Sequence, residues 1–89
     1  MEIRIDPHTA ARATERGTDE VEIKDVIETG NLLLTRPGRL RKAKVFGFDR
    51  ERFGKTYSQK RVEVVYAMDQ DVAVTVTVYV FFGEWKDEQ

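Results

Sequence analysis

The 89-residue sequence has no cysteine, one histidine and one serine, and these absences exclude several kinds of chemistry. Without cysteine the chain can form no disulfide, no thiolate nucleophile and no zinc site built on sulfur ligands. A single histidine, His8, argues against a transition-metal site, and the single serine, Ser58, lacks the glycine-flanked context of a nucleophile elbow. The glycine motifs that cradle phosphates or dinucleotides are also missing. We therefore expect neither a metal nor a cofactor.

Long apolar runs are missing as well. No apolar stretch approaches the roughly 18 residues that suggest a membrane span, and residues 1–7 lack the apolar core of a signal peptide. Together with the absence of cysteine, this predicts a cytoplasmic protein with no membrane partner. With 40% hydrophobic residues the chain can build one small core, so we expect a single domain over residues 1–85 and a flexible tail over residues 86–89.

What the sequence has in excess is positive charge in one segment. Residues 36–61 contain ten basic and two acidic residues, a net charge of +8, whereas residues 1–35 carry −4 and residues 62–89 carry −5. The overall charge of −1 thus hides a basic centre between acidic flanks. We call residues 36–61 the basic segment, because a local concentration of this kind is typical of a surface that binds polyanions.

The start of the chain predicts a short strand and a helix. Residues 2–5 alternate polar and apolar side chains, as a strand does. Asp6 followed by Pro7 is typical of a helix start, since the aspartate can accept a hydrogen bond from the first turn and proline fits the first helical position. Gly17 is typical of a helix end. We therefore expect a helix over residues 7–16.

A second helix follows directly. Asp19 and Glu22 have the spacing of a capping box, and Gly30 is a suitable stop, so the helix should begin near residue 20. Its apolar residues recur at roughly helical spacing and should face the core. They are Val21, Ile23, Val26 and Ile27. The front third of the chain thus predicts a helical hairpin.

The remaining two thirds have the pattern of strands. A short strand is expected over residues 32–35, broken by the turn at Pro37–Gly38, and another near residues 45–48. Two longer runs of alternation, residues 61–68 and 72–82, complete the set. The fold class predicted is α+β, with the N-terminal helical hairpin packed on one face of a twisted antiparallel β-sheet.

The last run should be a central strand. It follows the previous run after Asp69–Asp71, a plausible tight hairpin connection. One of its faces is wholly apolar and should be buried under the helices. That face consists of Val72, Val74, Val76, Val78, Val80 and Phe82. The opposite face, with Thr75, Thr77 and Tyr79, is amphipathic and could line a groove.

Three residues of the first helix form a polar stripe. His8, Arg12 and Arg16 are spaced four residues apart and lie along one helical face. Histidine can act as an acid or base near neutral pH, and arginine can bind phosphate through two hydrogen bonds. The alternative interpretation is structural: His8 stabilises the start of the helix and the arginines pair with nearby carboxylates.

The basic segment is the second candidate site. We place several of its charges in a loop over residues 49–59, interleaved with Phe48, Phe53 and Tyr57, a combination that suits single-stranded RNA. Two alternatives stay open. The charges could dock an acidic segment of a protein partner, or they could protect a solvated sheet edge from pairing. The candidate binding residues are Arg36, Arg39, Arg41, Lys42, Lys44, Arg50, Arg52, Lys55 and Lys60.

The outward face of the sheet is the third candidate. A tyrosine hydroxyl beside an arginine, here Tyr79 and Arg61, could stabilise or activate a phosphodiester. Glu63 would lie on the same face. A packed ring with its hydroxyl at the rim is the structural alternative. The functional interpretation requires that Arg61 and Tyr79 converge with His8 or Arg16.

These residues carry a family resemblance. The motif His8-x3-Arg12-x3-Arg16-Gly17, the second helix over Asp19–Gly30 and the later Thr77–Tyr79 resemble a bacterial and archaeal family described as domain of unknown function 4258. Val26–Gly30 matches the end of that family's second helix, whereas Thr18 departs from its usual aliphatic residue. The resemblance covers most of the chain, and its N-terminal motif is the specific part.

The resemblance implies both a fold and a set of functions. The family is similar to the RelE/ParE toxin superfamily, which packs two N-terminal helices on a twisted antiparallel sheet. RelE-like members cleave messenger RNA at the ribosome, ParE-like members act on DNA gyrase, and an antitoxin segment neutralises both kinds. RNA or the ribosome and an antitoxin-like protein are therefore the implied partners.

Two hypotheses follow. In the first, the chain is a RelE/ParE-toxin-like domain that cleaves RNA or inhibits translation without a metal; the candidate catalytic residues are His8, Arg12, Arg16, Arg61 and Tyr79. In the second, it is a non-catalytic module that binds RNA or an acidic protein segment through the basic segment. An isoelectric point near 5.8 counts against a nuclease that acts on the ribosome.

Overall fold

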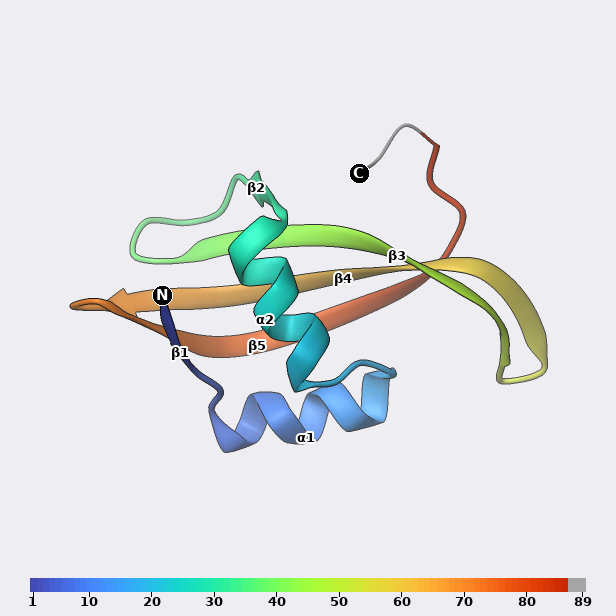
Figure 1. Ribbon diagram of the computed structural model, residues 1–89, viewed down its shortest axis with the longest axis horizontal. Coiled ribbons are helices and arrows are strands. Elements are labelled where there is room, and N and C mark those ends of the chain that lie inside the picture. Colours follow the sequence, from blue (N-terminus) through green and yellow to red (C-terminus); the bar gives the residue numbers. More distant parts are fainter. Residues whose placement is uncertain (87–89) are drawn as a thin grey trace.

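A computed structural model describes residues 1–86 and has the predicted α+β class, with two helices and a five-stranded sheet (Figure 1). The elements are β1 (Glu2–Arg4), α1 (Pro7–Arg16), α2 (Glu20–Thr29), β2 (Asn31–Leu33), β3 (Leu40–Arg52), β4 (Lys55–Asp69) and β5 (Val72–Gly83). Of the predicted tail over residues 86–89, residues 87–89 lie outside the described part of the chain.

The ends of α1 follow the local sequence. The Asp6 side chain accepts a hydrogen bond from the backbone N–H of His8 at 2.9 Å, and Pro7 occupies the first helical position. Gly17 ends the helix in the left-handed region, with φ of 94°. The predicted bounds of this helix are confirmed.

The predicted ends of α2 are confirmed as well, and a different kind of contact fixes each end. The Asp19 side chain accepts from the backbone N–H of Glu22 at 2.9 Å, as in half of a capping box. Gly30 is extended rather than left-handed. A Cβ there would lie 2.5 Å from the carbonyl oxygen of Val26 and 2.8 Å from that of Ala43, so the close approach of helix and sheet requires glycine.

The sheet has the strand order β1-β5-β4-β3-β2 and is mixed rather than antiparallel. Three of the four strand pairings are antiparallel, but β1 pairs in parallel with Val72–Val74 of β5. The middle strand is β4, and β5 lies between β1 and β4, so the prediction that the last run is a central strand is confirmed. The second half of β5 extends beyond the short β1 and runs beside α1 (Figure 1).

Both helices contribute to one core on one face of the sheet, which we call the helix face; the other we call the open face. The buried cluster consists of Ala13, Ile23, Val26, Ile27, Val62, Val64, Tyr66, Ala73 and Val78. Burial raises the pKa of the Tyr66 hydroxyl above its ordinary value of 10.0. Val21 was expected in the apolar stripe of α2, but it is 77% exposed and outside the core.

The helices contact different parts of the helix face. The first helix packs along β5, whereas α2 packs across β3 and β4, and the two cross at a steep angle in Figure 1. Each helix is therefore held mainly by the sheet. The predicted helical hairpin is not confirmed.

A β-bulge in β5 overturns the prediction of one continuous valine face. Tyr66 pairs with Thr75 and Val65 with Thr77, so Val76 has no cross-strand partner in this ladder and the alternation shifts by one residue. Before the bulge, Thr75 faces the helices, 3% exposed, and accepts a hydrogen bond from the backbone N–H of Asp6. Val72 and Val74 consequently lie on the open face, whereas Val78, Val80 and Phe82 lie on the helix face as expected.

The stretch predicted as a loop over residues 49–59 is instead the end of a long β-hairpin. Strands β3 and β4 stay paired as far as Arg52 and Lys55, and only Phe53 and Gly54 form the turn. The pairing shifts between Gly47 and Arg50, and this irregularity accompanies a strong twist (Figure 1). The hairpin tip therefore bends toward the C-terminal end of α1.

Candidate functional site

The open face gathers five polar residues from four elements. Glu63 on β4 pairs directly with Tyr79 on β5 and with Ala43 on β3. Because alternate residues of a strand share a face, Arg61 and Arg41 lie on the same side as Glu63. Together with Arg16 of α1 they form what we call the arginine–tyrosine cluster. Its members are Arg16, Arg41, Arg61, Glu63 and Tyr79.

Glu63 holds two of these arginines in place. One of its oxygens accepts a hydrogen bond from Arg41 Nε at 2.9 Å, and the other accepts one from Arg61 Nε at 2.9 Å. Glu63 is only 8% exposed, so both ion pairs are partly shielded from water. With one carboxylate against three guanidinium groups, the cluster keeps a formal net charge of +2.

Tyr79 lies between two guanidinium groups. The Arg41 guanidinium is 5.0 Å from the centroid of the Tyr79 ring, and that of Arg16 is 5.3 Å away. Arg16 also donates a hydrogen bond to the carbonyl oxygen of Val78, on the stretch of β5 that β1 does not pair with. This contact lets a helix residue reach across the strand edge to the open face. Arg16, Arg61 and Tyr79, three of the five predicted catalytic residues, thus lie in one cluster.

His8 and Arg12 lie elsewhere. His8 is exposed in the first turn of α1, and Arg16 lies eight positions further along the helix, about 12 Å along the axis. The Arg12 guanidinium forms an ion pair with Glu15 at 2.8 Å on the helix surface. Both residues therefore lie outside the arginine–tyrosine cluster, and the Arg12–Glu15 pair matches the structural alternative for Arg12.

Four residues of the basic segment bind the helices instead of facing solvent, and we call them the anchoring set: Lys42, Lys44, Arg52 and Lys60. Lys42 donates to the carbonyl oxygen of Ile27 at 2.8 Å, near the C-terminal end of α2. Lys44 donates to the Asp25 carboxylate at 2.8 Å. Cations suit the ends of helices where carbonyl groups lack partners.

The other two members anchor the end of α1. Lys60 is 5% exposed; its ammonium group donates to the carbonyl oxygen of Gly17 at 2.8 Å and pairs with the Glu22 carboxylate at 2.7 Å. Arg52 donates to the carbonyl oxygen of Glu15 at 2.8 Å. Both residues stabilise the attachment of helices to sheet, and the charge of Lys60 is compensated by Glu22.

The remaining four basic residues lie toward the two ends of the sheet. Arg36 and Arg39 are on the connection between β2 and β3, and the buried Nε of Arg39 has no hydrogen-bond partner among residues 1–86. At the other end, the Arg50 guanidinium is 4.8 Å from the Phe48 ring and the Lys55 ammonium is 5.6 Å from the Tyr57 ring. The basic segment is thus divided among two ends and two faces, and does not form one patch.

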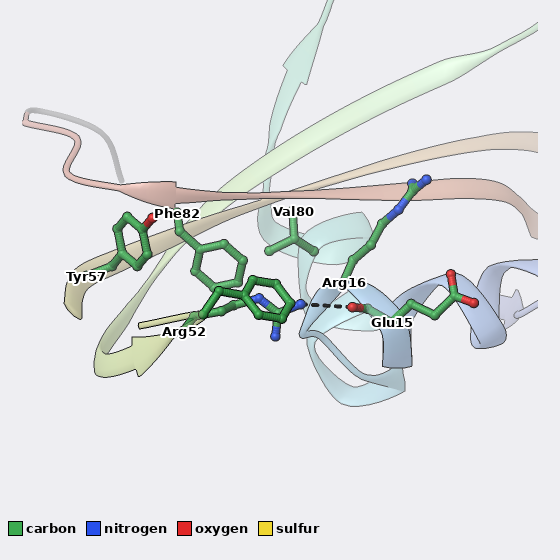
Figure 2. Close-up of a pocket in the computed structure, with 7 residues that line it drawn as sticks. Glu15, Arg16, Arg52, Tyr57, Val80 and Phe82 are labelled. Atoms are coloured by element: carbon green, nitrogen blue, oxygen red, sulfur yellow. Dashed lines mark hydrogen bonds between the residues drawn. The ribbon is translucent and has the colours of Figure 1, made fainter. Parts of the chain in front are cut away.

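A pocket of about 320 Å³ lies between the β3–β4 hairpin tip, the end of α1 and β5 (Figure 2). Its lining residues are Glu15, Arg16, Arg52, Phe53, Tyr57, Val80 and Phe82. Arg16 belongs to this pocket and to the arginine–tyrosine cluster. In Figure 2 its guanidinium points away from Glu15 and toward β5.

The sequence did not predict that Glu63 pairs with two arginines or that Arg41 lies on the open face. Arg41 was assigned to a general binding surface, although the alternation from Leu40 onward already puts it on the face opposite Leu40. Glu63 was placed on the outward face without a role. Its double ion pair depends on the register of three strands, which no single stretch of sequence specifies.

Comparison with known families identifies the chain. The family model described as a domain of unknown function, DUF4258, matches residues 5–80, and the chain belongs to this family. Neither the curated proteins nor the solved structures include a match. No helix within residues 1–86 is long and apolar enough to cross a membrane, and those residues contain no group of three or more side chains suited to hold a metal.

Proposed function

We propose that the chain is a RelE/ParE-toxin-like domain that binds single-stranded RNA on its open face. The observation that carries the proposal is the arginine–tyrosine cluster, in which two guanidinium groups lie over a tyrosine ring and one carboxylate ties one of them to a third guanidinium group. The two helices come near the start of the chain and four of the five strands follow them. This order supports the relation to the superfamily that the sequence motif implies.

Several features favour an RNA backbone as the ligand. Guanidinium groups bind phosphate oxygens through parallel hydrogen bonds, and aromatic rings stack on the bases of single strands. The Glu63 carboxylate fixes Arg41 and Arg61 before any ligand binds, which lowers the entropy lost on binding. Because the whole chain carries a charge of −1, attraction to RNA would be confined to this local surface.

Cleavage of the bound RNA is a second, more specific function that the position of Tyr79 favours. In such a step a ribose 2′-oxygen attacks the adjacent phosphorus and the bond to the 5′-oxygen breaks, leaving a 2′,3′-cyclic phosphate and a 5′-hydroxyl. Tyr79 would exchange protons with the reacting oxygens, and Arg16 and Arg41 would stabilise the added negative charge on the phosphate. His8 takes no part in this version.

The binding proposal predicts a strong dependence on salt. For a single strand, the logarithm of the affinity falls with the logarithm of salt concentration by about 0.7 per phosphate contact, so Arg16→Gln should lower that slope by about this amount. Lys24→Gln is the matched control, because it removes one charge from an exposed site on α2. Salt-independent binding by the unaltered protein would contradict the proposal, as would equal slopes for the two variants.

The cleavage version predicts a separation of binding from reaction. Tyr79→Phe keeps the ring and its contacts with the two arginines but removes the hydroxyl, so affinity should stay within about twofold while cleavage falls by about 100-fold or more. His8→Ala should leave both unchanged. The measurement is cleavage of labelled RNA with and without ribosomes. Intact RNA with the unaltered protein, or full cleavage by Tyr79→Phe, would rule this version out.

A further inference from the structure

The tip of the β3–β4 hairpin carries an exposed aromatic residue in an unfavourable backbone conformation. Phe53 is 91% exposed and has φ of 51°, and the following Gly54 has φ of 82°. A two-residue turn with both residues at positive φ favours asparagine before glycine. Phenylalanine there costs backbone strain and also exposes an apolar ring to water. Such a combination is typical of a contact site.

The pocket beside this tip is built from rings and one fixed cation. The Arg52 guanidinium lies 4.6 Å from the Phe53 ring centroid and 4.9 Å from that of Phe82, and it donates to the carbonyl oxygen of Glu15 (Figure 2). The Tyr57 and Phe82 rings also contact each other, with centroids 5.7 Å apart. The walls of the pocket are thus fixed before any ligand enters.

The close packing around Gly17 also shows that the fold fixes the position of Arg52. A Cβ at this residue would lie 3.0 Å from Arg52 Nη1 and 3.1 Å from Phe82 Cζ, so a side chain there would disturb the pocket wall. The pocket therefore offers aromatic faces and positive charge.

Arg16 connects this pocket to the arginine–tyrosine cluster. It lines the pocket, and its guanidinium reaches the Val78 carbonyl and the Tyr79 ring. A ligand with a flat ring next to a phosphate would fit this succession, the ring in the pocket and the phosphate near Arg16. A nucleotide of single-stranded RNA has that chemistry.

We propose that the pocket between Phe53, Tyr57 and Phe82 binds one base of single-stranded RNA, with a preference for purines. The volume of about 320 Å³ lies at the lower end of the range of small-molecule sites, which suits a single base. Purines are favoured because they present the larger stacking surface to the rings. The inference rests on the proposed RNA-binding function and adds to it a site that reads a base rather than a phosphate.

The test uses single-stranded RNA that contains one 2-aminopurine, whose fluorescence is quenched when it stacks on an aromatic ring. The protein should quench the probe on binding. Phe53→Asn should abolish most of the quenching and weaken the affinity by about tenfold or more, as expected for a lost base–aromatic contact. Asparagine is the residue that this turn prefers, so the variant relieves backbone strain and is expected to fold. Leu34→Asn, at a fully exposed site on the β2–β3 connection, should change neither quantity.

Salt separates this inference from the proposed function. The ratio of affinities between the unaltered protein and Phe53→Asn should be the same at low and high salt, because stacking releases no counterions. Salt-dependent RNA binding with no quenching, or with no effect of Phe53→Asn, would overturn the base site and leave Phe53 as a contact for a protein partner. An absence of RNA binding by the unaltered protein would overturn both proposals.

Discussion

The two faces of the sheet use neighbouring basic residues in opposite ways. Arg41 and Lys42 are adjacent in β3, yet Arg41 lies over Tyr79 on the open face while Lys42 donates to a carbonyl of α2 on the helix face. Lys60 and Arg61 are divided in the same way on β4. Net charge along the chain therefore does not measure the charge that a surface presents, because alternation in a strand sends successive residues to different environments.

The chemistry of the side chains matches this division. A lysine ammonium is a compact donor that can fill the space at a helix end, and all three lysines of the anchoring set contact α2 or the end of α1. On the open face the planar Arg41 guanidinium lies over the Tyr79 ring and shares the Glu63 carboxylate with Arg61. The helix face uses positive charge for stability, and we propose that the open face uses it for binding.

The largest effect on stability is predicted for a substitution of Lys60. Lys60→Met should lower the free energy of unfolding by about 2–4 kcal/mol, since it leaves Glu22 and the Gly17 carbonyl without their buried donor. Urea denaturation measures this loss, and Lys24→Met should change the stability by less than about 0.5 kcal/mol. The RNA affinity of the folded variant should keep its salt dependence. A stable Lys60→Met with weakened RNA binding would reverse the assignment of this lysine.

The smallest effect is expected at the partly exposed pair of Lys44 and Asp25. The hydrogen bond from Lys44 holds the pKa of the Asp25 carboxyl below its ordinary value of 3.8, with a further contribution from Thr29. Because the folded-state pKa is the lower one, the stabilisation is complete above the ordinary pKa and disappears as the pH falls through the folded-state pKa. The Asp25 pKa can be followed by NMR titration. It should rise in Lys44→Met, and it should not move in Lys24→Met, which removes the neighbouring charge; equal shifts in the two variants would contradict the pairing.

The helices were predictable because their ends are encoded locally. Asp6 with Pro7, Gly17 and Asp19 each act on backbone groups within a few residues, so the sequence alone located both helices. The two glycine contacts that fix the helices against the sheet are not local. Gly30 approaches Ala43 and Gly17 approaches Arg52, and neither contact can be read before the strands are paired.

The faces of the strands were harder to predict than the strands themselves. Val76 falls in an unbroken alternation of valines, and nothing at that position marks the bulge that exchanges the faces of Val74 and Thr75. The turn at Phe53–Gly54 was hidden for a related reason, since phenylalanine is unusual at positive φ. Both departures arise where tertiary contacts outweigh local preference, and the second lies at the proposed base site.

The candidate site was predictable only in part. Arg16 and Tyr79 were singled out from a motif and an outward strand position, and they contact each other. The same motif also pointed to His8 and Arg12, because helical spacing cannot show how far a helix extends past the sheet edge. Glu63, which orders the cluster, was assigned no role because its function appears only when β3, β4 and β5 are in register.

The most direct test of this account compares Arg41→Gln with Lys42→Gln, which each remove one positive charge at adjacent positions. The measurement is the salt dependence of affinity for single-stranded RNA, with urea denaturation as the check on folding. Arg41→Gln should lower the slope by about 0.7, whereas Lys42→Gln should keep the slope and lose about 1 kcal/mol of stability. Equal losses of slope would show that the basic segment acts as one diffuse charge, and would contradict the division between the two faces.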